Sequence, residues 1–161
     1  MDTRFSLALL LEEPADLTGH SKLIEELGPD LGGLIIAAPE IVPLLDGTLP
    51  WPSPAARAVA ALRARTGLPG ALQAALLACS DPVLLALDAA RPPPPVTLLR
   101  RLHLDPRAGN ALVLDGDELS LPGRFRQGCL GPLSRALLEG ERQLAVVLRR
   151  LHCSTLTYSA L

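Results

Sequence analysis

The stretch over residues 5–22, FSLALLLEEPADLTGHSK, constrains this chain most. Its first seven residues form an almost unbroken apolar run, which is typical of a strand covered on both faces of a parallel sheet. In open α/β sheets, ligands bind in the loops that leave the carboxyl ends of such strands. We therefore expect the loop that runs from Glu12 to Lys22 to carry the functional site.

The composition predicts one globular domain over residues 1–161. Hydrophobic residues make up 48% of the chain and charged residues 20%, so a core can form and disorder is not expected. The net charge of -2 gives no electrostatic attraction to nucleic acid or to an anionic membrane. With aromatic residues at only 2%, base-stacking surfaces are also disfavoured.

The cysteines and histidines do not indicate a metal site. Cys79, Cys129 and Cys153 lie far apart, no Cys-x-x-Cys occurs, and the three histidines do not cluster with them. We expect reduced thiols in a cytoplasmic protein. No signal peptide is expected, and no apolar run approaches the roughly 20 residues that span a bilayer.

Strands and helices are predicted to alternate along the chain. Apolar runs predict strands at 5–11, 33–38, 83–87, 111–114, 118–121 and 155–158. The second and third of these are separated by two helices, one between Ser53 and Gly67 and one at 69–79. Further helices are predicted at 22–27, 96–104, 130–138 and 141–151. An Asp-Gly turn at Asp115 is expected to join strands 111–114 and 118–121 as a hairpin. This order implies a three-layer α/β sandwich with a mostly parallel sheet.

The opening loop resembles the phosphate loop of the molybdenum-cofactor guanylyltransferases, which are small nucleotidyltransferases. Their pattern is L-A-G-G-x-S-x-R-M-G-x-D-K, and residues 10–22, LLEEPADLTGHSK, align with it without a gap. Gly19 and Lys22 match the pattern. Glu12 and Glu13 stand where the family has its glycine pair.

Three further blocks follow in the family's order. Residues 67–72, GLPGAL, are similar to the helix that reads G-P-L-A-G-I, and Asp88 matches the aspartate of the strand ending in C-D-M-P. Residues 119–151 resemble the proline-leucine segment, basic loop and paired helices of the C-terminal half. The resemblance implies a Rossmann-like sheet of the nucleotide-diphospho-sugar and nucleotidyltransferase type.

The resemblance also implies a site for GTP, magnesium and molybdopterin. In the family, the glycine pair lets backbone N–H groups close on the triphosphate, and these positions are Glu12 and Glu13 here. Gly19 and Lys22 would contact the nucleotide, with Lys22 neutralising phosphate charge. Asp88 would hold a magnesium ion that offsets charge during attack on the α-phosphate. Lys22 and Asp88 are therefore the candidate catalytic residues.

Arg124 and Arg126 belong to the segment 122–127, PGRFRQ, which we predict to be a basic loop. Arginine binds phosphate bidentately, so these two residues are candidates for holding the anionic phosphate of a pterin. A basic surface loop without a ligand is the alternative.

The leading hypothesis is a nucleotidyltransferase fold that acts by binding a pterin, a nucleotide or a partner protein, with weak or no guanylyl transfer. Its basis is the glutamate pair, because a carboxylate about 4 Å from a phosphate is repelled by on the order of 4 kcal/mol at an effective dielectric of 20. Leu17, at the arginine position, adds to this loss. The alternatives are an active nucleotidyltransferase with a rebuilt loop, in which a metal ion bridges a glutamate to phosphate, and an unrelated α/β domain.

Each candidate also has a purely structural explanation. Glu12 and Glu13 can be the solvated start of a loop, and Lys22 can be a surface residue of the following helix. Asp88 can cap the turn that follows its strand, as aspartates commonly do.

Overall fold

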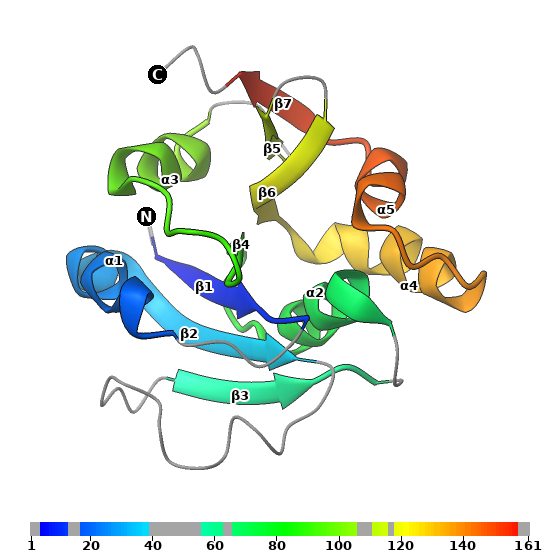
Figure 1. Ribbon diagram of the computed structural model, residues 1–161, viewed down its shortest axis with the longest axis horizontal. Coiled ribbons are helices and arrows are strands. Elements are labelled where there is room, and N and C mark those ends of the chain that lie inside the picture. The colour runs from blue at the N-terminus through cyan, green and yellow to red at the C-terminus, as the bar shows by residue number, and fades with distance from the viewer. Residues whose placement is uncertain are drawn as a thin grey trace.

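The computed structural model describes residues 4–12, 17–38, 56–62, 66–105, 111–115 and 118–157. Its strands form one seven-stranded sheet in the order β3-β2-β1-β4-β6-β5-β7 (Figure 1). The strands are β1 (Phe5–Leu10), β2 (Leu31–Ala38), β3 (Ala56–Ala60), β4 (Leu84–Asp88), β5 (Ala111–Asp115), β6 (Glu118–Phe125) and β7 (Ser154–Thr157). The α-helices are α1 (Ser21–Leu27), α2 (Gly67–Ala78), α3 (Val96–His103), α4 (Leu130–Leu138) and α5 (Leu144–Arg150). Short 3-10 turns occur at η1 (Thr18–His20), η2 (Gly28–Asp30) and η4 (Gln127–Cys129).

The sheet is mostly parallel. β1 lies between β2 and β4 and runs parallel to both, and β2 pairs in parallel with β3. β6 runs antiparallel to β4 and to β5, while β7 pairs in parallel with β5. The predicted mostly parallel α/β fold is therefore confirmed.

Helices cover both faces of the sheet, which gives the predicted three layers (Figure 1). α1 and α3 pack on one face, where their leucines meet alternate β1 residues such as Phe5, Leu7 and Leu9. α2, α4 and α5 pack on the other face against Ala8 and Leu10. Alternate side chains of a strand point to opposite faces, so an apolar run buried on both sides is what this arrangement requires.

The segment between Ser53 and Gly67 was expected to be a helix, and this prediction is wrong. Residues 56–60 form the edge strand β3, and Ile36 of β2 pairs with Ala58 in the parallel register. The helix would have placed Val59 and Leu62 on one buried face, but Leu62 is 67% exposed. Pairing with β2 overrides the helical preference of an alanine-rich segment, because propensity is a weak local term.

The segment 122–127 was expected to be a loop, and this prediction is also wrong. β6 continues through it to Phe125, pairing with β4 on one side and with β5 on the other. The hairpin prediction is confirmed, since β5 and β6 pair antiparallel with Asp115 opposite Glu118. The remaining residues of that turn, 116–117, lie outside the described residues.

The helix after the first loop begins one residue earlier than predicted. Ser21 is the first residue of α1, and His20 holds the N-cap position with no side-chain capping hydrogen bond. Beyond Leu27 the chain continues as a short 3-10 turn. None of the helices within the described ranges is both long and apolar enough to cross a membrane.

Candidate functional site

Three parallel strands end at one edge of the sheet, and this edge carries the candidate site. Leu10, near the end of β1, pairs with Ala37 of β2 and with Asp88, the last residue of β4. The chain leaving β1 reaches Glu12 two residues later. The fold therefore brings Glu12 and Asp88 to the carboxyl edge of neighbouring strands, where open α/β sheets bind ligands.

Glu12 is exposed, and its carboxylate lies beside the start of α2. A Cβ placed on Gly67 would be 3.5 Å from Glu12 Oε1. Gly67 has a φ of +59°, a left-handed conformation that glycine adopts without strain. The first N–H groups of a helix favour a nearby negative charge, and the Glu12 carboxylate lies close to the residue that begins α2. Glu13 lies outside the described residues.

Asp88 is held by the turn that follows β4. Its Oδ1 accepts a hydrogen bond from the Ala90 N–H at 3.0 Å, and its Oδ2 lies 3.6 Å from Nε of Arg91. The Asp88 carbonyl also accepts the Arg91 N–H at 3.2 Å. Asp88 thus caps this turn, which was the structural alternative drawn from the sequence.

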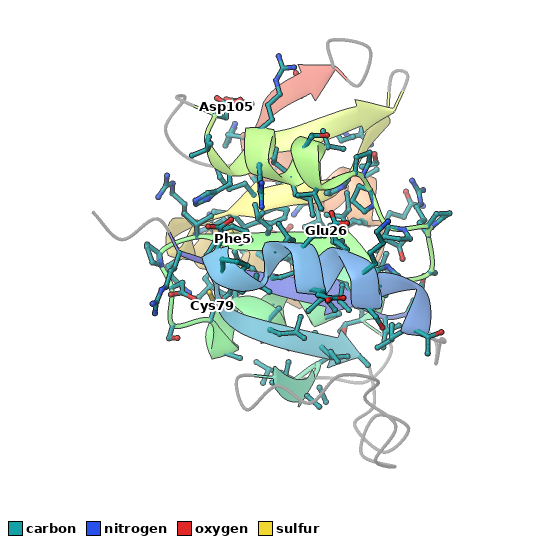
Figure 2. All side chains as sticks on the ribbon, turned by 90° about the vertical axis from the view of Figure 1, so that its left-hand side faces the viewer. Phe5, Glu26, Cys79 and Asp105 are labelled. Carbon is teal, nitrogen blue, oxygen red and sulfur yellow. The ribbon has the colours of Figure 1, made fainter. Side chains whose placement is uncertain are left out.

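The structure does not bring Lys22 or Gly19 into contact with Asp88. Lys22 lies on α1 with its side chain 88% exposed, and its Nζ is 4.0 Å from Oε1 of Glu26 (Figure 2 labels Glu26 on α1). Gly19 lies in the preceding 3-10 turn, and no described atom comes within 4 Å of a Cβ added there. Within the described residues, neither makes a contact that ties it to the carboxyl edge.

Arg124 does not lie at this edge, which corrects the expectation that it receives a pterin phosphate. It pairs with Leu85 near the amino end of β4, because β6 runs antiparallel to that strand. Its side chain is 1% exposed, and Nη1 donates to the carbonyls of Leu102, His103 and Asp105 at 3.1, 3.3 and 2.9 Å. Its donors therefore hold the end of α3 instead of facing a ligand.

Arg126 follows β6 and is exposed at the opposite edge of the sheet from Asp88. The next residue, Gln127, donates to the carbonyls of Leu76 and Cys79 at the end of α2. Figure 2 shows Cys79 on the same side of the molecule as Phe5, where β1 begins. Both arginines of the segment 122–127 are thus separated from Glu12 and Asp88 by the length of the strands.

Arg91 is the site residue that sequence reasoning missed. It lies on the turn after β4 and pairs with Asp88. The available signal was its position three residues after an aspartate at a strand end, directly before four prolines. This spacing places the two side chains on one turn, although only the structure shows that they meet.

The residues at this edge do not fit a divalent cation well. Both carboxylate oxygens of Asp88 already contact groups of its own turn. Across the described ranges, no three His, Cys, Asp or Glu side chains gather in a way that could hold a metal ion. Magnesium prefers several oxygen ligands in near-octahedral geometry, and its binding here would displace Arg91 from Asp88.

His20 ends the loop that leaves β1 and is buried, with 3% of its surface exposed. Neither ring nitrogen finds a hydrogen-bond partner within the described part of the chain. Burial lowers the pKa of His20 below its ordinary value of 6.5, because the charged imidazolium loses its hydration. The neutral ring is therefore favoured in the folded protein.

Folding stability should fall as the pH drops below 6.5, the pKa of His20 in the unfolded chain. Between that value and the lower folded-state pKa, the unfolded chain binds a proton that the folded chain does not. Melting temperatures measured from about pH 5 to 8 should show this decline in the wild type and a smaller one in His20→Leu. The exposed His152 provides the control, and His152→Asn should keep the wild-type profile. An identical decline in His20→Leu would contradict the assignment.

The sheet order and the two helical layers match a fold that is also found in solved nucleotidyltransferase structures. No protein-family model and no curated protein sequence matches the chain. Solved structures do. The molybdopterin-guanine dinucleotide biosynthesis protein A of Archaeoglobus fulgidus has a TM-score of 0.72 at 15% identity, with 97% of this chain and 85% of that chain covered.

Two other solved structures agree with this result. The 2-C-methyl-D-erythritol 4-phosphate cytidylyltransferase of Thermus thermophilus has a TM-score of 0.64 at 18% identity, covering 96% of this chain and 88% of that chain. The Mycobacterium tuberculosis protein Rv0371c, solved as a complex with manganese, has a TM-score of 0.67 at 13% identity over the same shares. Likeness at these identities shows the fold.

Proposed function

We propose that this protein uses a nucleotidyltransferase fold to bind a phosphorylated small molecule, a nucleotide or a pterin phosphate, with weak or no guanylyl transfer. The bound group would lie at the carboxyl edge of β1 and β4. The observation that carries the proposal is the position of Glu12. Its carboxylate lies beside Gly67 at the start of α2, on the loop where the resembled family has open glycines.

A carboxylate on the phosphate loop weakens triphosphate binding in two ways. Its charge has the same sign as phosphate, and its side chain fills space that a glycine leaves open. Glu12 is exposed, so water screens the repulsion and the effect is smaller than between buried charges. Among the described residues, Lys22, which the resemblance assigned to neutralising phosphate charge, is exposed and pairs with Glu26.

A working nucleotidyltransferase that uses Lys22 and Asp88 with magnesium and GTP is the second candidate. Asp88 lies at the end of a parallel strand, and one protein of the same fold was solved with manganese. This candidate requires Asp88 to exchange Arg91 for a metal ion. It predicts GTP binding that depends on magnesium, whereas the first candidate predicts binding without that requirement.

Replacing Glu12 should strengthen nucleotide binding. We expect Glu12→Gln to tighten GTP binding about tenfold by removing the charge, and Glu12→Gly to tighten it further by also removing the side chain. Isothermal titration of GTP into each variant measures the affinity, and the rise in melting temperature gives an independent reading because ligands that bind the native state stabilise it.

Glu25→Gln is the matched control, because Glu25 is exposed on α1 and carries the same charge. Its GTP affinity should equal that of the wild type. If Glu12→Gln and Glu25→Gln gave the same affinity, Glu12 would not be what limits nucleotide binding and the proposal would lose its basis.

A further inference from the structure

In the turn after β4, the guanidinium of Arg91 lies beside Asp88, where the resemblance implies a metal ion. Oδ2 of Asp88 faces Nε of Arg91 at 3.6 Å, and Oδ1 accepts the Ala90 N–H. The Asp88 side chain is only 19% exposed, so little of its carboxylate remains open to another partner. The carboxylate expected to hold magnesium is thus engaged by its own turn.

We propose that Arg91, oriented by Asp88, binds a phosphate group of the ligand and that this binding needs no divalent metal. The inference rests on the proposed function, because it names the residue that would receive the phosphate at the same edge. Asp88 acts as a positioning residue in this arrangement, and Arg91 is the group that touches the ligand.

The arginine is turned so that its binding face remains open. Nε is the atom that faces Asp88, and the terminal nitrogens Nη1 and Nη2 make no hydrogen bond within the described ranges. The Arg91 side chain is 59% exposed, so its fork of terminal donors can reach solvent. A guanidinium anchored on its Nε side can bind two oxygens of one phosphate group with the other donors.

The backbone fixes this turn against the strand that leads into the candidate loop. The Ala89 N–H donates to the Leu10 carbonyl at 2.9 Å, two residues before Glu12. Pro92–Pro95 follow Arg91 and restrict the chain to an extended conformation, which limits the movement of the turn. Arg91 therefore sits on a fixed element at the carboxyl edge, next to the β1 loop.

The charge on this turn suits a small phosphate ligand. Arg91 contributes one positive charge, and the adjacent Asp88 offsets part of it. A phosphomonoester or a pyrophosphate can be held by one guanidinium, whereas a triphosphate is usually neutralised by a metal ion as well. The expected ligand class is therefore a compound with a terminal phosphate or a diphosphate.

The test is a calorimetric titration of pyrophosphate into the full-length protein, once with excess EDTA and once with excess magnesium. We expect binding in EDTA that Arg91→Gln weakens about tenfold and that Arg91→Lys restores only in part. In EDTA, Asp88→Asn should bind more weakly than the wild type, because asparagine still accepts the Ala90 N–H but loses the ion pair that orients Arg91. Arg100→Gln is the control for overall charge, because Arg100 is exposed on α3 and pairs with Asp30; it should bind like the wild type.

Three results would overturn the inference. The first is pyrophosphate binding that occurs only with magnesium and is lost in Asp88→Asn. The others are binding that Arg91→Gln leaves unchanged, and no binding of pyrophosphate in EDTA. Melting curves of each variant confirm that it folds. Nucleotide binding that ignores Arg91 would overturn this inference alone and leave the proposed function standing. Efficient, magnesium-dependent guanylyl transfer by the wild type would instead overturn the proposed function.

Discussion

Replacing Arg124 by leucine is expected to lower the free energy of unfolding by about 4 kcal/mol. The side chain is 1% exposed, and its Nη1 serves the carbonyls of Leu102, His103 and Asp105 at the end of α3. Leucine would leave these acceptors without their donor and would not fill the same volume. Because a helix end carries carbonyls without partners inside the helix, Arg124 is what satisfies them here.

Equilibrium denaturation of Arg124→Leu, compared with Arg126→Leu as the control variant, measures this effect. Arg126 is exposed two residues further along, so its replacement should change the stability by no more than about 0.5 kcal/mol. Arg124→Lys should recover part of the loss, since lysine keeps the charge but not the planar fork of donors. Equal stabilities of the two leucine variants would show that the contacts of Arg124 do not hold α3.

Introducing a methyl group at Gly70 should destabilise the protein by about 3 kcal/mol. A Cβ at this position would lie 2.5 Å from Cβ of Thr66 and 3.2 Å from Cβ of Ala61. Thr66 is 3% exposed and precedes α2, and its β-branched side chain cannot swing away at its Cβ. The helix α2 would have to move away from the segment that contains Ala61, which directly follows β3.

Gly131→Ala is the matched control for Gly70→Ala. Gly131 also lies in a helix, α4, and no described atom comes within 4 Å of a Cβ added there. Alanine has the higher helix propensity, so this variant should be neutral or more stable by up to about 1 kcal/mol. Thermal denaturation of both variants compares them, and an equally stable Gly70→Ala would contradict the close packing of α2 on Thr66.

The buried strands could be predicted from the sequence because helices pack on both faces of the sheet, so every side chain of such a strand must be apolar or nearly so. The runs that became β1, β2 and β4 are almost entirely apolar, and few other structures accommodate such runs. β3 could not be predicted in the same way. Its alanines favour a helix locally, and only hydrogen bonding to β2 makes them a strand.

The candidate site was predicted in part. The loop after β1 and the aspartate ending β4 lie at one edge, as the resemblance implied, since strand order brings them together. The two arginines on and just after β6 were misplaced because the direction of that strand decides which edge Arg124 and Arg126 approach. Likewise, the pairing of Arg91 with Asp88 depends on the geometry of one turn, which residue types alone do not determine.

One measurement tests the central claim most directly: whether the purified protein transfers a guanylyl group. The protein is incubated with GTP, magnesium and molybdopterin, and the release of pyrophosphate and the formation of the dinucleotide product are followed together. The account predicts little or no product above the protein-free control, while calorimetry on the same preparation detects a bound phosphorylated ligand. Product formation that disappears in Asp88→Asn would contradict the account and establish a working, metal-dependent nucleotidyltransferase.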